Sequence, residues 1–261
     1  MNSHASSRIT RIVTLLLIAI GICTRVGAAD EGRQYYELRV YTTKSADQQQ
    51  RINDYWRNAG VPAYNRQGIQ PIGVFTEIED SPTNKVYVLI PCDSLETFAA
   101  IPARLAADTV YQPAAGDFLN APKSNPAFEN LQSSLLVAFD GMKQMVIPPP
   151  AQKPKVFELR TYLSPSENKG LNKIQMFEHG EITTMKEVGL APIIYSRTLV
   201  GPQMPSLVYI TCAVNLEEHK KHWQGFGSAP VWKELQADPQ YKDNMKQAIS
   251  VMLKRTAASQ L

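Results

Sequence analysis

The feature of this sequence that most constrains its fold is an internal repeat. The segment YYELRVY at 35–41 recurs as KVFELRTY at 155–162, so that Glu37 aligns with Glu158, 121 residues further along the chain. The same offset aligns later segments of the chain as well. One offset that holds over so long a span, almost without gaps, indicates a tandem duplication.

Both repeats show the same order of predicted elements: strand, helix, strand, strand, helix, strand. Strands are predicted from alternating, Tyr- and Val-rich runs, helices from apolar residues at helical spacing, and turns from Gly, Pro, Asn and Ser. In the first repeat the predicted strands are 35–41, 70–78, 85–90 and 133–139, and the predicted helices are 46–66 and 94–107. In the second repeat the strands are 155–162, 190–200, 206–213 and 247–255, and the helices are 168–187 and 215–224, with short helical pieces within 228–246.

This order is the ferredoxin-like βαββαβ motif, whose helices cover one face of an antiparallel sheet. The bare face must be buried, and two copies in one chain can bury each other's. The sequence therefore predicts an α+β protein in which two ferredoxin-like domains, 34–145 and 154–257, pack sheet to sheet as a pseudo-dimeric α/β barrel. The proline-rich segment 146–153 is predicted to be a stiff linker between them.

Residues 1–29 have the pattern of a secretory signal peptide. Arg8 and Arg11 precede an uncharged, mostly apolar stretch at 12–23, and small residues follow up to Ala29. The apolar stretch is shorter than the roughly 20 residues that a membrane helix needs. We expect export, to the periplasm or outside the cell, with no membrane span after processing. The alternatives are an uncleaved N-terminal membrane anchor and a mitochondrial presequence.

Charge and cysteine content restrict the partners of the mature chain. The formal net charge is +3, but the leader carries three arginines and no acidic residue, so the mature chain is neutral. A neutral chain does not indicate a nucleic acid or an anionic membrane as partner. Cys92 and Cys212 remain after processing, either as a disulfide or as two small apolar residues at strand ends.

The first strand of each repeat carries an alternating set of charged and phenolic residues. Because strand side chains alternate between faces, we expect the apolar set to face the helices and this other set to point between the sheets. One interpretation is a structural ion-pair network. The other is a ligand site that grips a carboxylate or a polar aromatic molecule. The residues concerned are Glu37, Arg39 and Tyr41 in the first repeat, and Glu158, Arg160 and Tyr162 in the second.

Catalytic and metal-binding signals are weaker. His179 and Glu158 are the best candidates for a general base near such a cavity, although His179 also fits a partly exposed structural role. His219 and His222 lie on one helix face, but no third ligand is identifiable, so no metal site is predicted. The chain has no phosphate-binding glycine loop, nucleophile-elbow serine or HExxH motif, and no cofactor is predicted.

Three groups of motifs resemble the NIPSNAP family. They are the ELRxY strands at 37–41 and 158–162, the segments GIQPIGVF at 68–75 and GLAPIIYS at 189–196, and the hairpin strands KVYVLI and SLVYIT. The resemblance implies the dimeric α/β-barrel fold, shared with small monooxygenases and haem-handling enzymes, with the tandem chain acting as its own dimer. It leaves a binding protein, a cofactor-independent monooxygenase-type enzyme and a protein-interaction module as hypotheses. The chain is expected to be a monomer or a homodimer.

Overall fold

Residues 32–78, 84–149 and 154–261 are described by the computed structural model of the chain. The predicted signal peptide, 1–29, lies outside the described residues, as do 79–83 and the end of the predicted linker, 150–153. Among the helices of the described part, none is both long and apolar enough to cross a membrane.

The first half follows the predicted order of elements and adds one helix, α4, that the sequence pattern does not indicate. Pro113 and Gly116 lie within α4, and both residues disfavour helix, which hides it from pattern analysis. A short π-helical turn, η1, separates α1 from α2. The elements are β1 (Tyr35–Thr43), α1 (Ala46–Tyr55), η1 (Trp56–Gly60), α2 (Val61–Arg66), β2 (Gly73–Glu77), β3 (Asn84–Cys92), α3 (Leu95–Ala107), α4 (Tyr111–Leu119) and β4 (Asn130–Ala138).

The second half repeats this arrangement, including the π-helical turn at the aligned position. The elements are β5 (Val156–Leu163), α5 (Glu167–Met176), η2 (Phe177–Glu181), α6 (Ile182–Glu187), β6 (Ala191–Val200), β7 (Ser206–Ala213), α7 (Leu216–Ser228), α8 (Pro230–Ala237), the 3-10 turn η3 (Pro239–Tyr241) and β8 (Gln247–Arg255).

Side-chain caps begin the main helices at aligned positions of both halves. Ser45 caps α1 and Ser166 caps α5, each accepting a hydrogen bond from a backbone N–H of the first turn. Ser94 and Asn215 do the same for α3 and α7. Such a cap satisfies a backbone donor that would otherwise lack a partner, and it fixes where the helix begins.

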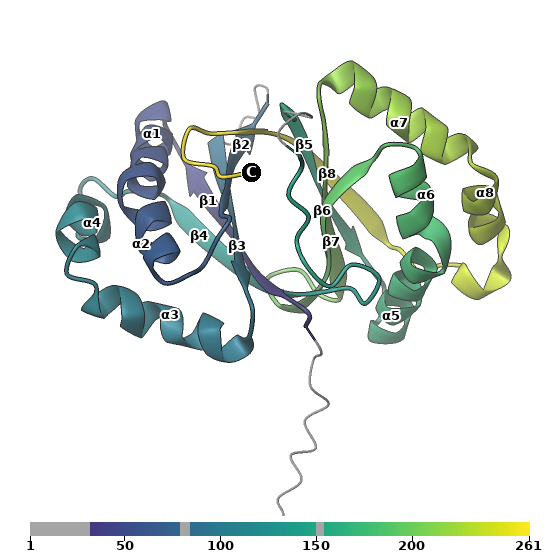
Figure 1. Ribbon diagram of the computed structural model, residues 1–261, viewed down its shortest axis with the longest axis horizontal. Helices are drawn as coiled ribbons and strands as arrows, with labels where there is room; N and C mark the ends of the chain where they lie inside the picture. The colour runs from purple at the N-terminus through teal and green to yellow at the C-terminus, as the bar shows by residue number, and fades with distance from the viewer. Residues whose placement is uncertain (1–31, 79–83, 150–153) are drawn as a thin grey trace, which may run out of the picture. The chain divides into compact units, whose positions relative to one another are not determined.

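Within the described residues, eight antiparallel strands close into a barrel in the order β1-β3-β2-β8-β5-β7-β6-β4. Each half contributes one four-stranded sheet with its last strand at an edge, β4-β1-β3-β2 and β8-β5-β7-β6. The halves join where β2 pairs with β8 and where β4 pairs with β6. Helices α1 to α4 cover one sheet and α5 to α8 the other, on opposite outer sides of the barrel (Figure 1). The predicted pseudo-dimeric α/β barrel is therefore confirmed.

The two sets of strand side chains face opposite to the prediction. Tyr36 and Leu38 belong to an apolar cluster in the barrel interior, with Phe157 and Leu159 of the second half. The charged and phenolic set lies on the helix side, which is the outer sheet surface that the helices cover. Arg39, for example, donates a hydrogen bond to the Tyr64 hydroxyl of α2.

The expectation that this set points between the sheets is therefore wrong, for a physical reason. The interior of a closed barrel is narrow and has no helices to supply polar partners, so a charge there would stay poorly compensated. The helix side offers hydroxyl, imidazole and indole groups instead. Each first strand is buried on both faces, so its alternation does not reveal which face meets the helices. The helix side holds all six residues of the set: Glu37, Arg39, Tyr41, Glu158, Arg160 and Tyr162.

Candidate functional site

In the first half, Arg39 and Glu37 form a closed ion pair on the helix side of β1. Arg39 Nε donates to Glu37 Oε1 at 2.7 Å, and Nη2 donates to Oε2 at 2.9 Å. Nη2 also donates to Tyr64 Oη at 3.0 Å, and Ser133 Oγ donates to Glu37 Oε1 at 2.7 Å. Two parallel bonds of this kind orient the guanidinium as well as neutralising it. Arg39 Nη1 is not engaged by Glu37.

In the second half, the corresponding carboxylate has a different set of partners. Glu158 accepts hydrogen bonds from Arg160 Nη1 at 3.2 Å, from Trp223 Nε1 at 2.7 Å and from Ser250 Oγ. His219 Nε2 lies 2.9 Å from Glu158 Oε2. Burial would raise the pKa of Glu158, but its hydrogen bonds with His219 and Ser250 and the charge of Arg160 hold this pKa below its ordinary value. Glu158 is therefore an ionised, fully engaged structural carboxylate in this structure.

A cavity of about 350 Å³ lies on the helix side of the first half, and we call it the aromatic pocket. Its volume falls within the range of small-molecule sites, roughly 300–1,000 Å³. Two adjacent rings show how its wall is built: Tyr55 of α1 stacks on Phe118 of α4, with centroids 4.0 Å apart and an angle of 12° between planes. Aromatic and cationic side chains dominate the lining, namely Arg39, Tyr41, Tyr55, Tyr111, Phe118 and Phe128.

The phenols of the aromatic pocket are hydrogen-bond donors at physiological pH. Burial raises the pKa of Tyr41, and the neighbouring Arg39 offsets this only in part. Burial likewise raises the pKa of Tyr111, whose hydroxyl lies 2.7 Å from that of Tyr55. Protonated phenols and a guanidinium together favour a ligand oxygen that accepts hydrogen bonds.

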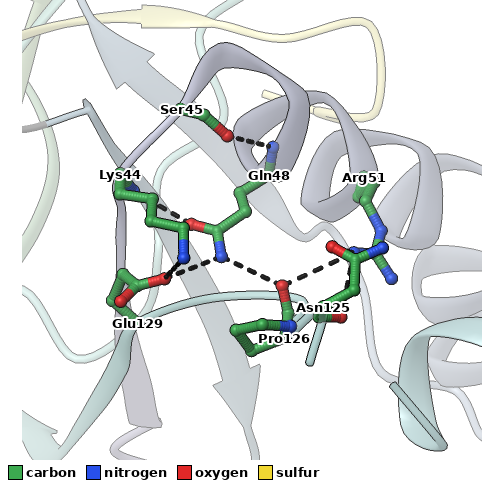
Figure 2. A network of polar contacts seen from close by, with 7 residues as sticks. All are labelled: Lys44, Ser45, Gln48, Arg51, Asn125, Pro126 and Glu129. Atoms are coloured by element: carbon green, nitrogen blue, oxygen red, sulfur yellow. Dashed lines mark hydrogen bonds and ion pairs between the residues drawn. The ribbon is translucent and has the colours of Figure 1, made fainter. Parts of the chain in front are cut away.

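One wall of the aromatic pocket is the segment between α4 and β4, and Gln48 holds it in place (Figure 2). The buried Gln48 amide donates from Nε2 to Pro126 O and to Glu129 Oε1, both at 2.9 Å. Its Oε1 accepts from Lys44 N at 2.9 Å, so all parts of the amide are engaged. Arg51 adds a bond from Nη1 to Asn125 Oδ1 at 3.3 Å. These contacts tie the wall to the beginning of α1.

At the aligned positions of the second half, large side chains pack together. Arg160 lies under the ring of Trp223, with Cζ 4.3 Å from its centroid. Phe226 packs on Trp232, with 4.7 Å between ring centroids. These two residues align with Leu105 and Tyr111, which line the aromatic pocket in the first half. The two halves thus differ in what occupies the same place between sheet and helices.

A buried ion pair in the second half was not indicated by the sequence analysis. Lys173 of α5 and Glu181 of η2 are bonded to each other, and their side chains are 4% and 2% exposed. The Lys173 ammonium lies 5.0 Å from the Phe177 ring centroid and 5.4 Å from that of Trp232. Burial raises the pKa of Glu181, and Lys173 opposes the shift. The repeat held a signal for this pair, because Lys173 aligns with the buried Ile52.

The remaining candidates do not line the aromatic pocket. His179 is exposed on η2, with Nδ1 2.5 Å from the Tyr241 hydroxyl of η3. His219 is buried against Glu158, whereas His222 lies 3.6 Å from Glu218. The Tyr162 hydroxyl lies 2.7 Å from that of the buried Tyr209.

The histidine, cysteine and acidic side chains of the described residues bear on metal and disulfide chemistry. In the part of the chain that the structure describes, no three His, Cys, Asp or Glu side chains are grouped so as to hold a metal ion. Cys92 and Cys212 are both free and buried, and they lie in different clusters: Cys92 on the helix side and Cys212 in the barrel interior.

Comparison with known proteins gives a family and a set of similar folds. The NIPSNAP family model matches residues 36–140 and 157–260. No curated protein sequence matches the chain significantly.

Solved structures that resemble the fold include three that each cover most of this chain. A candidate monooxygenase from Fusobacterium nucleatum shares 10% identity and a TM-score of 0.55, over 86% of this chain and 93% of that one. A candidate monooxygenase from Lactobacillus acidophilus shares 13% identity and a TM-score of 0.55, over 85% and 94%. An anthrone oxidase-like protein shares 10% identity and a TM-score of 0.50, over 87% and 93%.

Proposed function

This chain belongs to the NIPSNAP family. We propose that it binds a small planar aromatic molecule bearing an acceptor oxygen. The binding site is the aromatic pocket of the first half. The observation that carries the proposal is a guanidinium, Arg39, oriented by Glu37 at the wall of a cavity whose other walls are aromatic rings. Rings would stack against the ligand, while Arg39 and the protonated phenols would bind its oxygen.

The second half supports a single site per chain. Trp223 stacks on Arg160 and donates to Glu158, so an aromatic side chain of the protein itself packs against the second ion pair. The residue aligned with Trp223 in the first half is Pro102, which supplies neither a ring nor a donor. Of the two predicted sets of ligand-binding residues, we therefore retain Arg39 and Tyr41 and treat the second set as structural.

The test is calorimetric titration of the full chain with 2-naphthoate and 2-naphthol. The Arg39→Met change should weaken the binding of 2-naphthoate by about tenfold or more, because it removes a charge-assisted hydrogen bond to the carboxylate. Arg160→Met is the matched control, because it removes the aligned arginine outside the pocket, and it should leave binding unchanged. Equal losses in both variants, or no binding by the wild type, would refute the proposal.

A second variant protects this test against simple misfolding. Leu105→Phe introduces the residue that the second half carries at the aligned position, Phe226, and adds bulk to the pocket without altering charge. Both probes should then bind more weakly while the melting temperature stays near that of the wild type. Unchanged binding in a folded Leu105→Phe variant would place the ligand elsewhere.

Oxidation of the bound aromatic molecule is the second candidate function. It is supported by three of the fold neighbours, of which two are described as candidate monooxygenases and one as anthrone oxidase-like. We propose binding first because the described lining of the aromatic pocket supplies a guanidinium and phenols to hold a ligand, whereas it includes no carboxylate or imidazole as a base. Oxygen uptake with anthrone as substrate distinguishes the two functions: uptake that depends on Arg39 supports an enzyme, and binding without uptake supports a binding protein.

We also propose that the protein is exported through the signal peptide predicted at residues 1–29. The support is the order of two arginines, an apolar stretch and small residues before Asp30. N-terminal sequencing of the protein recovered outside the cytoplasm should begin at Asp30. An intact N-terminus in the membrane fraction would instead indicate an uncleaved anchor.

A further inference from the structure

The barrel interior is packed at one end and hollow at the other. At the packed end, Phe75 and Phe157 lie 4.9 Å apart between ring centroids, and the C-terminal residue Leu261 is buried among them. The hollow end is a cavity of about 480 Å³, where the β6–β7 hairpin lies. We call it the hairpin-end cavity, and it is separated from the aromatic pocket by the sheet itself.

Aliphatic side chains from both halves form the inner wall of the hairpin-end cavity. Leu38, Leu159 and Val208 are almost fully buried there. Val40, Ile249 and Val251 also line the cavity but remain partly exposed. Protein interiors are normally close-packed, so an apolar wall left facing open space in a barrel indicates room for an apolar ligand group.

The rim of the hairpin-end cavity is polar and carries positive charge. Among the described residues that line it, Lys85 is the one charged side chain, and no ion pair joins it to another described residue. The hydroxyls of Thr198 and Ser206 lie 2.8 Å apart, and Ser206 also donates to Gln203 O at 2.7 Å. These two hydroxyls are thus already engaged, whereas no described side chain forms an ion pair with the Lys85 ammonium.

We propose that the hairpin-end cavity binds an amphipathic carboxylate, with its acyl chain along the aliphatic wall and its carboxylate at Lys85. Burial of the acyl chain would remove the aliphatic wall of the cavity from water. The carboxylate would stay at the solvent-exposed rim, where the Lys85 ammonium needs little desolvation. The site is distinct from the aromatic pocket, because the two lie on opposite faces of β1: Leu38 lines one and Arg39 the other.

The experiment is calorimetric titration of the full chain with decanoate and, as an uncharged analogue, decan-1-ol. Decanoate should bind the wild type. Lys85→Gln should weaken the binding of decanoate by about fivefold and leave the affinity for decan-1-ol unchanged, whereas Lys85→Arg should restore the affinity for decanoate. Val40→Trp, which fills the cavity from a partly exposed position, should abolish binding of both probes. If that variant does not fold, Thr161→Phe on β5 fills the same space and serves instead.

Arg39→Met separates this proposal from the one for the aromatic pocket. Decanoate binding should persist in Arg39→Met, and 2-naphthoate binding should persist in Lys85→Gln. The proposal is overturned if the wild type does not bind decanoate, if folded Lys85→Gln binds it as tightly as the wild type, or if Arg39→Met abolishes it. The last result would place the acyl chain in the aromatic pocket.

Discussion

The buried pair of Lys173 and Glu181 allows a quantitative test of what holds the second half together. Replacing Lys173 by Met keeps the length of the side chain but removes the charge that neutralises Glu181. The carboxylate would then be left 2% exposed among aromatic rings, without its cation. A buried carboxylate without its hydrogen-bonded cation costs free energy, and the charge of Arg160 offsets this only in part.

The size of the effect follows from burial. Removing one partner of a buried ion pair costs about 3–5 kcal/mol, and each kcal/mol lowers the melting temperature of a chain this size by roughly 2–4 °C. Lys173→Met should therefore lower the melting temperature by roughly 6–20 °C. Replacing both partners, with Lys173→Met and Glu181→Leu together, should recover most of the loss. The first half shows that an uncharged solution exists, because Ile52 and Gly60 occupy the aligned positions.

The stability lost in Lys173→Met should also depend on pH, and the protonation of Glu181 decides in which direction. Burial raises the pKa of Glu181 in the folded state. A carboxyl whose folded pKa is raised favours the folded state below its unfolded pKa, about 4.3, and this contribution is lost as pH rises through the folded pKa. In Lys173→Met the opposing cation is gone, so the destabilisation should be larger at pH 8 than at pH 5.

Urea unfolding of the two single variants, the double variant and the wild type, at both pH values, measures these free energies. An exposed pair supplies the control: Arg57 and Asp54 are 2.8 Å apart but 51% and 41% exposed, so Arg57→Met should cost less than about 1 kcal/mol. The reasoning fails if Lys173→Met costs no more than Arg57→Met. It also fails if the double variant is as unstable as the single one.

Three further predictions concern the first half. Gly60→Ala should lower the free energy of unfolding by about 1–3 kcal/mol through overpacking, because an added Cβ would lie 2.7 Å from Trp56 Cε3. In Gly116→Ala the added Cβ meets nothing within 4 Å. Helix propensity should therefore raise the free energy of unfolding of that variant by about 0.5–1 kcal/mol in the same urea assay. Gln48→Ala should release the wall at Pro126, speeding amide hydrogen exchange in 121–129 and weakening 2-naphthoate binding. Unchanged exchange there would mean that Gln48 does not hold the wall.

The repeat and the periodicity of the sequence were enough to predict the barrel. Motifs such as ELRxY recur at one offset, and the order of strands and helices is the same on both sides of the proline-rich segment. The predicted helix 94–107 also begins where Ser94 caps α3 in the structure. These signals are local, and the ferredoxin-like topology follows from them because few arrangements bury both sheets.

The orientation of the site could not be predicted in the same way. Tyr35 and Tyr36 are neighbours on β1, and both are buried, one toward the helices and one inside the barrel. Apolar residues therefore occur on both faces, and only closure of the barrel decides which face is which. Lys173 was missed for a related reason, since a lysine on a helix is ordinarily exposed and its burial depends on its ion pair with Glu181 of η2.

The two seams, β2 with β8 and β4 with β6, have an evolutionary consequence. In a barrel made from two identical chains, every substitution appears twice, and a change that closes one cavity closes the other. Fusion into one chain removes this constraint, because each copy of a position mutates alone. The second half, with Trp223 and Lys173, could then fill the space between its sheet and helices with side chains. Its twin could keep an opening, because the loss of one opening no longer entailed the loss of both.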